Sequence, residues 1–455
     1  MQMPEIASLK NGQVVGEDLS ALSPGNVSVP GSPSYDAAVS LWNGAVGKRP
    51  AAIVRCVSSE DVSAVLRYAN TNRYAVSVKG GGHDWAGRSL VEDGIVIDLS
   101  GMKSIEIDPD ARTAVVGGGV LSGELVDAAE PHDLVPIVGT ARDVGLAGFT
   151  LGGGYGPLLN RYGLAADNLL GATIVLSDGN VVTADENNEP ELLWGLRGGG
   201  GNFGVVTSMR LQLHYQPEIL TCLMLFPWND AEKFLEAFAE ITAEEADDLT
   251  ILVILMTADD GNAAPVMFAT WAGEHKKGEQ LFERFNSIGS PLFSETKPMS
   301  LKDFLAIFRV EDRKHQFMRN RWTKTLPQDL RKILLEATEC RTTPGQYIVL
   351  HHFCGAAARI LPDATAFGMR DSHYLVEAIA SWAGGDSEEN AHRNWVFGLA
   401  EKLAAHAMPG GYANLLGPEE TELYRDAYGG NAERLRLVKQ SYDPDNSFSS
   451  TLLIP

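Results

Sequence analysis

The spacing of apolar and polar positions predicts an ordered run of short elements between residues 49 and 217. Apolar, β-branched stretches predict strands over Ala51–Arg55 and Ala75–Val78, and helical spacing predicts a helix between them over Ser58–Asn70, capped by Ser58 or Ser59. Together these elements make one β-α-β unit. The other elements expected in this region are strands over Gly94–Leu99, Ser104–Asp108, Thr113–Val116 and Gly204–Leu213, a helix over Leu121–Glu130, and a pair of strands within Leu170–Thr183 joined by Ser177-Asp178-Gly179-Asn180.

Beyond Pro217, helices and strands alternate without an internal repeat. The expected helices cover Asp230–Ala243, Leu301–Phe308, Leu326–Ala337 and Asn390–His406, and the expected strands cover Leu249–Met256, Val266–Trp271 and Gly345–His352. This order is typical of an antiparallel sheet with helices on one face. We therefore expect a second, layered domain after a first α+β domain.

The same pattern sets the domain boundaries. The N-terminal region is rich in serine, proline and glycine, which predicts an irregular arm, with a short helix over Tyr35–Trp42. The polar, proline-marked tail Asp443–Pro455 is expected to return to the first domain. The expected segments are an arm at residues 1–48, a first domain at 49–217, a second domain at 218–408 and a C-terminal segment at 409–455.

Charge and composition narrow the kinds of partner. The chain has 37 basic and 59 acidic residues and a formal net charge of −22, the wrong sign for binding a polyphosphate backbone or an anionic membrane surface. We expect this acidic surface to keep the protein soluble rather than to recruit cationic substrates. No export signal marks the N-terminus and no apolar segment reaches about 18 residues. We therefore expect a cytoplasmic protein with neither a nucleic-acid nor a membrane partner.

The cysteines give no sign of a metal or redox centre. They are widely spaced and form no Cys-x-x-Cys pair, so we expect reduced core residues and no metal site. They are Cys56, Cys222, Cys340 and Cys354.

Glycines are concentrated in four clusters of the first half of the chain. Clustered glycines let backbone N–H groups approach an anion closely. Any one cluster is better explained by a tight turn between strands, but several close approaches together predict a large phosphate-bearing cofactor. The clusters are Gly80–Gly82, Gly117–Gly119, Gly152–Gly154 and Gly198–Gly201.

The first cluster directly follows the strand that contains Val76-Ser77-Val78. Its successive amides predict a pyrophosphate nest with His83 at the rim. A Gly-x-Gly-x-x-Gly match at Gly199, Gly201 and Gly204 precedes a strand instead of lying between a strand and a helix, so no Rossmann site is expected.

Several longer stretches carry a resemblance to a known family. They are Arg49–Cys56, Gly81–His83, Gly87–Ser89, Leu151–Gly156, Tyr162–Asn168, Trp194–Gly204 and Tyr442–Asn446. In this order and spacing the chain resembles, over nearly its whole length, the berberine-bridge-enzyme-like flavoproteins of the vanillyl-alcohol-oxidase and p-cresol-methylhydroxylase superfamily. The resemblance implies an α+β fold, in which residues 49–217 form a two-part FAD-binding domain of the p-cresol-methylhydroxylase type. Residues 218–408 then form a substrate domain built on an antiparallel sheet covered by helices.

The resemblance also implies how FAD is held. In the family, the histidine after the glycine pair bonds to the 8α-methyl of the flavin, and here it is His83. Further contacts to the cofactor are expected from backbone and side-chain groups of the glycine loops and of a segment near the C-terminus. They are Val78, Lys79, Gly80, Gly81, Gly82, Asp84, Gly139, Thr140, Val144, Gly145, Gly148, Gly152, Gly153, Gly154, Gly204, Val205, Val206, Tyr412 and Asn414.

The chain departs from the family pattern at a few positions. Many relatives add a second flavin link from a cysteine where this chain has Ala141, so we expect a single 8α-histidyl link. Leu415 replaces a tyrosine that often helps to deprotonate the substrate. Arg142 and Asp143 replace smaller residues, and they are expected either to reach the substrate or to form an ion pair with each other.

Hydride transfer to a flavin requires a second group that takes the substrate proton. Relatives place an active-site tyrosine at Tyr155, and Tyr412 lies in the segment that passes over the flavin. Alternation along their strand directs one of His351 and His352 toward the flavin, unless both only satisfy local hydrogen bonds. The expected catalytic residues are Tyr155, His352 and Tyr412.

The implied function is that of an FAD-dependent oxidase. Its partners would be O2, which becomes hydrogen peroxide, and a small organic substrate oxidised at an alcohol, amine or benzylic or phenolic centre. Val144 favours this function, because a small residue at this place in relatives leaves room for O2. The alternatives are a dehydrogenase or a flavin oxygenase of the same fold, or a flavin-binding protein without catalysis.

Overall fold

The computed structural model describes residues 15–21, 23, 25–244, 246–258, 260–308 and 314–454. Residues 1–14 of the expected N-terminal arm and Pro455 of the expected C-terminal segment lie outside these ranges. Within them, no helix combines the length and the apolar content needed to span a bilayer.

A four-stranded sheet forms the first part of the N-terminal domain. Its order is β1 (Val27–Ser28), β2 (Ala52–Arg55), β4 (Ile95–Asp98) and β3 (Val76–Lys79), and both β2 and β3 run parallel to β4. The predicted β-α-β unit is confirmed, although β2 and β3 flank β4 instead of pairing with each other. The N-terminal arm is less irregular than predicted, because its strand β1 joins this sheet. The helix of the arm, α2 (Tyr35–Ala38), ends earlier than predicted.

Helix α3 (Ser59–Asn72) packs between this sheet and the next. Ser58 begins it with a capping box: its hydroxyl accepts the Asp61 N–H at 3.2 Å, and the Asp61 carboxylate accepts the Ser58 N–H. The apolar side chains that it buries recur at helical spacing, which is why the sequence predicted this helix closely. They are Val62, Val65, Leu66 and Ala69.

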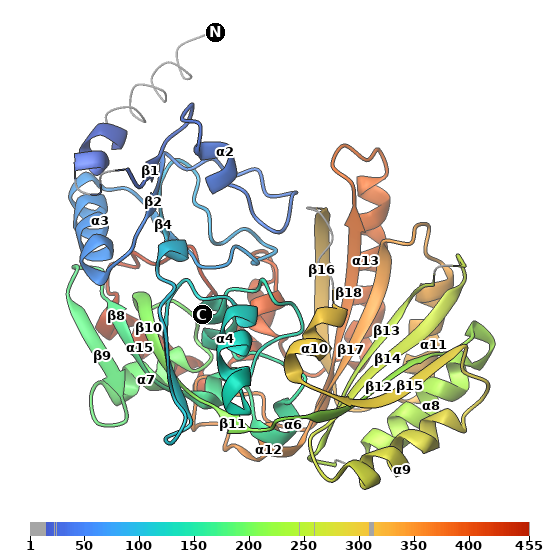
Figure 1. Cartoon of the computed structure of the whole chain (residues 1–455). Helices are drawn as coiled ribbons and strands as arrows, with labels where there is room; N and C mark the ends of the chain where they lie inside the picture. The colour runs from blue at the N-terminus through green and yellow to red at the C-terminus, as the bar shows by residue number, and fades with distance from the viewer. Residues whose placement is uncertain are drawn as a thin grey trace.

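A five-stranded antiparallel sheet forms the second part of the domain (Figure 1). Its order is β5 (Ile105–Asp108), β6 (Thr113–Gly117), β10 (Val205–Gln212), β8 (Leu169–Val175) and β9 (Val181–Asp185). The helices of this part are α4 (Ser122–Ala129), α5 (Leu146–Leu151), α6 (Leu159–Tyr162) and α7 (Pro190–Leu196), and a small pair of strands joins β7 (Leu134–Val135) to β11 (His214–Tyr215).

The second domain is built on a seven-stranded antiparallel sheet (Figure 1). Its order is β15 (Phe293–Met299), β12 (Ile219–Leu225), β14 (Ala263–Trp271), β13 (Leu249–Thr257), β17 (Gln346–Phe353), β18 (His373–Trp382) and β16 (His315–Thr323). The sequence predicted only β13, β14 and β17 of this sheet. The other four strands, β12, β15, β16 and β18, lack the simple alternation of apolar and polar residues that predicts a strand.

Helices cover one face of this sheet. They are α8 (Ala231–Thr242), α9 (His275–Asn286), α11 (Gln328–Glu339) and α13 (Glu389–Leu403). The opposite face turns toward the first domain, where α10 (Leu301–Ile307) contacts α4 and α12 (Gly355–Arg359) contacts α6 (Figure 1). The predicted α+β class, with an antiparallel sheet covered by helices, is confirmed.

The C-terminal segment contacts the first domain at several points. It contains α14 (Thr421–Ala427) and α15 (Ala432–Tyr442). Asn202 donates to the Leu452 carbonyl at 2.8 Å, and Ser450 donates to the Arg88 carbonyl at 2.6 Å. Short 3₁₀ turns elsewhere cover Leu99–Gly101, Glu130–His132, Ala165–Asn168, Trp228–Asp230, Ala404–His406, Ala413–Leu415 and Gly429–Asn431.

Candidate active site

Two glycines allow the first glycine loop to lie directly against the loop of residues 139–145. A Cβ added to Gly81 would lie 2.3 Å from the backbone nitrogen of Gly145, and a Cβ on Gly145 would lie 2.3 Å from that of Gly81. No other residue fits at either position without moving the backbone. This close approach brings His83 of one loop next to Asp143 of the other.

Two neighbouring side chains contact the imidazole of His83, one at a face of the ring and one at a ring nitrogen. Its ring stacks on Trp42 with 5.2 Å between centroids, and the Trp42 N–H donates to the neighbouring Gly82 carbonyl at 3.0 Å. Its Nε2 lies 2.8 Å from a carboxylate oxygen of Asp143. The side chain keeps 15% of its exposure, so the predicted flavin ligand is fixed in position yet reachable.

The contacts of Arg142 and Asp143 test the predicted ion pair between these two residues. Arg142 pairs with Asp127 at 2.6 Å on the surface of α4, and Asp143 pairs with His83. Burial raises the pKa of Asp143, but the close contact with His83 and the charge of His83 outweigh burial and lower that pKa below its usual value. The expected ion pair between Arg142 and Asp143 is therefore wrong, because each side chain has a different partner.

The groups around these loops fit a flavin. Nε2 of His83, Oδ1 of Asp143 and Nη1 of Arg142 are among the buried polar atoms that have no hydrogen-bond partner within the described residues. A Cβ added to Gly148 of α5 would meet nothing within 4 Å, so open space lies above this helix. Unpartnered polar atoms beside a histidine and an open, glycine-lined surface suit a large polar cofactor.

Several predicted cofactor contacts gather around this space. The loop that meets Gly81 contains Gly139, Thr140, Val144 and Gly145. Gly80 and Gly82 are the chain neighbours of Gly81. A Cβ on Gly152 would lie 2.0 Å from Asn414, which packs the C-terminal segment directly on the third glycine cluster. The Val206 carbonyl, near Gly204 and Val205 at the start of β10, would lie 2.4 Å from a Cβ on Gly118.

Lys79 and Asp84 have structural partners. The Lys79 ammonium donates to the Ala38 carbonyl at 2.7 Å and lies 3.5 Å from Asp98. Asp84 forms an ion pair with Arg88. Their side chains therefore hold the loop in place.

The phenol of Tyr155 is buried and its hydrogen bonds are satisfied. The Trp322 indole donates to its oxygen at 3.2 Å, and its oxygen lies 2.8 Å from Nε2 of His373. Because Nδ1 of His373 lies 2.7 Å from the Asp371 carbonyl and donates to it, Nε2 accepts the Tyr155 proton. Burial raises the pKa of Tyr155 well above its usual value and lowers that of His373 to about 3. This arrangement favours a positioning role for Tyr155 over that of a base.

Tyr412 lies against Tyr155, with 4.7 Å between ring centroids. Its oxygen accepts the Gly154 N–H at 2.9 Å and the Asn414 amide at 3.0 Å. Burial raises its pKa to about 12, and the donors from Gly154 and Asn414 oppose this rise. Tyr412 and Asn414 thus join the C-terminal segment to the third glycine cluster, as expected for residues that pass over the cofactor.

His351, and not His352, lies on the sheet face with these tyrosines. Its ring contacts Tyr155 edge-on at 6.3 Å, and its Nε2 lies 2.8 Å from the Glu377 carboxylate on β18. Glu377 is buried, with 9% side-chain exposure, and its charge raises the pKa of both Tyr155 and Tyr412. The sequence analysis missed Glu377, although a single acidic residue within the apolar run of β18 was a signal that could have found it.

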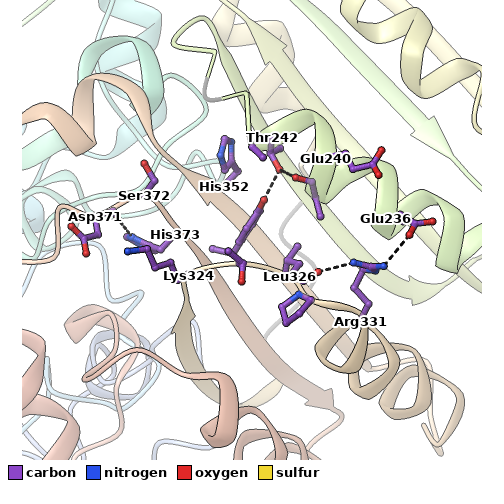
Figure 2. A pocket seen from close by; sticks show the side chains of 15 residues that line it. Glu236, Glu240, Thr242, Lys324, Leu326, Arg331, His352, Asp371, Ser372 and His373 are labelled. Atoms are coloured by element: carbon purple, nitrogen blue, oxygen red, sulfur yellow. Dashed lines mark hydrogen bonds and ion pairs between the residues drawn. The ribbon is translucent and has the colours of Figure 1, made fainter.

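His352 faces the helices instead. It lines a cavity of about 660 Å³ with Thr242 of α8 and Tyr374 of β18, and Figure 2 shows it beside Thr242. Successive residues of a strand point to opposite faces, so His351 and His352 cannot both face the tyrosines. The prediction of His352 as the flavin-side histidine is therefore wrong by one position.

Replacing His352 with alanine should leave the rate of anaerobic flavin reduction close to that of the wild type. The side chain lies on the far face of the sheet from Tyr155 and contacts none of the tyrosines of the site. Stopped-flow absorbance would measure this rate, with His351→Ala as the matched variant on the opposite face. A large loss in His352→Ala with none in His351→Ala would contradict this assignment of faces.

The protein should lose stability as the pH falls from about 6.5 toward 4. Burial lowers the pKa of His352 to about 4 and that of His373 to about 3, from 6.5 in the unfolded chain. The unfolded state then binds more protons in this window, so acid favours it. His352 alone would account for about 3 kcal/mol of the loss at pH 4. Thermal unfolding across this range would measure the loss, and His352→Asn should reduce its steepness; an unchanged slope would contradict it.

The cysteines and metal-ligating groups form no further centre. None of the four cysteines forms a disulfide: Cys56, Cys222 and Cys354 are buried, whereas Cys340 is exposed, which corrects its prediction as a core residue. No group of three potential metal ligands occurs in the part of the chain that the structure describes.

Comparison with known proteins places this site in a family. Residues 50–185 match the model of an FAD binding domain, and residues 411–455 match the model described as berberine and berberine like. The chain is 30% identical to (R)-6-hydroxynicotine oxidase of Paenarthrobacter nicotinovorans over 444 residues, which cover 93% of this chain and 95% of the relative.

Solved structures agree with these matches. The crystal structure of 6-hydroxy-D-nicotine oxidase from Arthrobacter nicotinovorans superimposes with a TM-score of 0.88 at 29% identity, covering 95% of this chain and 98% of that one. A variant of berberine bridge enzyme superimposes with a TM-score of 0.85 at 23% identity, covering 96% of this chain and 98% of that one, which shows the shared fold. The predicted FAD-linked oxidoreductase is confirmed, and the chain belongs to the berberine-bridge-enzyme-like family of FAD-linked oxidases.

Proposed function

We propose that this enzyme takes a hydride from a small organic substrate with an alcohol, amine or benzylic or phenolic centre, and that O2 reoxidises the flavin to give hydrogen peroxide. We further propose that one bond to His83 holds the FAD. The acidic net charge of −22 supports small molecules and O2 as partners rather than nucleic acid. When bound, FAD supplies the hydride acceptor.

The observation that carries this proposal is the pairing of Glu377 with His351 beside the buried tyrosines. A carboxylate on the sheet face that turns toward the first domain is suited to take the hydroxyl or amine proton while the hydride leaves. His351, 2.8 Å away, orients Glu377 and stabilises its charge. Tyr155 and Tyr412 lie within one aromatic cluster with His351, where they would orient the substrate and exclude water.

The rest of this sheet face supports a substrate with an apolar body. Leu252 of β13 pairs directly with both His351 of β17 and Phe268 of β14, so all lie on one face. Ile254, two residues along β13, lies on the same face, and Leu252, Ile254 and Phe268 are only partly buried. Beside this apolar surface, His351 and Glu377 supply the polar contact. A compact amine or alcohol fits this surface better than an oligosaccharide, which needs many hydrogen bonds.

A second candidate function is a dehydrogenase that passes electrons to another acceptor. The oxidase is favoured because the 30% identical relative is named an oxidase and because Val144, where small residues leave room for O2, remains small here.

Peroxide release tests the proposal. Purified enzyme should form peroxide with at least one member of a panel of apolar amines and alcohols, with (R)-6-hydroxynicotine as the probe suggested by the relative. Anaerobic bleaching of the flavin by a compound that yields no peroxide in air would favour the dehydrogenase. Absence of both signals across amines, alcohols and phenols would contradict the proposed chemistry.

A further inference from the structure

We propose that the cavity on the helix-covered face of the seven-stranded sheet is a second small-molecule site, and that it binds a protonated amine with a compact apolar body. The cavity lies on the opposite face of this sheet from His351 and Glu377, so it is separate from the flavin site and goes beyond the proposed oxidation. Its volume of about 660 Å³ lies within the range of roughly 300–1,000 Å³ that is typical of sites for small organic ligands.

Buried side chains of the sheet form the floor of this cavity. His352 of β17 pairs across the sheet with Tyr374 of β18, and 5.5 Å separates the centroids of their tilted rings. The Tyr374 oxygen lies 2.5 Å from the Thr242 hydroxyl of α8, which fixes the tyrosine in place. Ala239 and Leu326 add apolar surface beside the rings. Such a floor suits the apolar body of a ligand, and aromatic faces also attract a cation.

His352 supplies this floor with a polar atom that lacks a partner. The residue is 3% exposed, and its Nδ1 lies 4.0 Å from Sγ of Cys354. No hydrogen bond joins its Nε2 to any residue that the structure describes. His373 also lines the cavity, but its two nitrogens already contact Tyr155 and the Asp371 carbonyl. A buried polar atom without a partner costs free energy, and a ligand that bonds to Nε2 of His352 would remove this cost.

The charge of His352 favours an ammonium group as that partner. Burial lowers the pKa of His352 to about 4, so the ring is uncharged at neutral pH and does not repel a cation. A neutral imidazole has one nitrogen that accepts a hydrogen bond, and either nitrogen can take this role. An ammonium group only donates, so its binding would select the tautomer of His352 in which Nε2 accepts.

The rim of the cavity carries an excess of negative charge. Arg331 and Glu236 neutralise each other at 3.2 Å. The other charged groups of the rim, Glu240, Lys324 and Asp371, form no ion pair with a described residue, and Figure 2 shows Glu240 and Asp371 on opposite sides of the pocket. Two carboxylates against one ammonium attract a cation and repel an anion. Because these groups are exposed, they add more to selectivity than to affinity.

A matched pair of probes tests the class of ligand. Cumylamine is protonated at neutral pH and has no hydrogen on the carbon next to nitrogen, so it cannot give a hydride to a flavin. Cumyl alcohol is its uncharged analogue of the same shape. Isothermal titration calorimetry on the FAD-loaded protein should show binding of the amine, and the alcohol should bind about 10-fold more weakly or worse. Equal binding of the two probes, or no binding of the amine at millimolar concentration, would overturn the proposal.

Substitutions in the cavity test where the amine binds. His352→Phe keeps an aromatic ring but removes both nitrogens, so it should weaken amine binding by about 10-fold or more. Glu240→Gln combined with Asp371→Asn should weaken it by about 5-fold, as expected for exposed charges. Glu244→Gln is the matched control: Glu244 follows α8, pairs with Arg284 at 2.7 Å and does not line the cavity, so this variant should bind the amine as the wild type does.

Two further variants distinguish this site from the flavin site and from a folding defect. The amine binding that is lost in His352→Phe should persist in Glu377→Gln, because Glu377 lies on the other face of the sheet. Loss in Glu377→Gln with none in His352→Phe would place the amine at the flavin and overturn the proposal. Ala243→Trp keeps the floor intact and fills the mouth of the cavity from an exposed position, so it should also abolish binding. Wild-type affinity in Ala243→Trp would contradict the site even if His352→Phe does not fold.

Discussion

Replacing Glu377 with glutamine should slow anaerobic reduction of the flavin by about 10²–10⁴-fold, the usual contribution of a general base. Glutamine keeps the shape of the side chain and its place beside His351, but it cannot accept the substrate proton. Flavin content and the unfolding temperature should change little, because the substitution is nearly isosteric. Stopped-flow reduction with a substrate identified by peroxide release would measure the effect.

Glu295→Gln is the matched control for this experiment. It removes a carboxylate from the same sheet, but Glu295 is exposed on the edge strand β15 and pairs with Lys297 at 2.8 Å. It should reduce its flavin at the wild-type rate. If the flavin of Glu377→Gln is reduced as fast as that of Glu295→Gln, Glu377 is not the base, and Tyr412 becomes the candidate.

Replacing His83 with alanine should abolish acid-stable flavin altogether. Alanine has no nucleophile for the 8α carbon, and Ala141 offers no thiol for a second bond. The fold should persist, because the glycine contacts that shape the loop involve Gly81 and Gly145 and not the imidazole. Acid precipitation followed by absorbance of pellet and supernatant would measure the distribution, and non-covalent FAD should still bind to the folded variant.

Trp42→Ala is a useful companion to this variant. It removes the side chain stacked on His83 but keeps the imidazole, so it should retain covalent flavin and form the bond more slowly. Acid-stable flavin in His83→Ala, or a flavinylated cysteine peptide in the wild type, would contradict the single histidyl link.

The sequence predicted the first domain better than the second because its signals are local. The capping box at Ser58 and the apolar stripe of α3 are readable within one helix. Strand β16 is different, since it buries Arg319 within a polar stretch that reads as a loop. That charge is neutralised by Glu419 and Glu420, about one hundred residues away, and no local pattern shows such a partner.

The site could be predicted where motifs define it and not where the sheet does. His83 directly follows a run of glycines that predicts a cofactor site from the sequence alone. The contact between His83 and Asp143 depends on how two loops that are distant in the sequence meet, which no local pattern shows. The choice between His351 and His352 required the pleat of β17, because a shift of one residue reverses the face. Glu377 lies on a strand whose apolar run shows no alternation, so its orientation followed only from its neighbours in the sheet.

Reaction of the reduced flavin with O2 tests most directly whether this chain acts as an oxidase, and it requires no knowledge of the substrate. The purified enzyme would be reduced anaerobically by light or dithionite and then mixed with oxygenated buffer in a stopped-flow instrument. We predict rapid return of the oxidised flavin spectrum with one equivalent of hydrogen peroxide per flavin. Reduced flavin that persists in oxygen, or that reoxidises no faster than free FAD, would contradict the account.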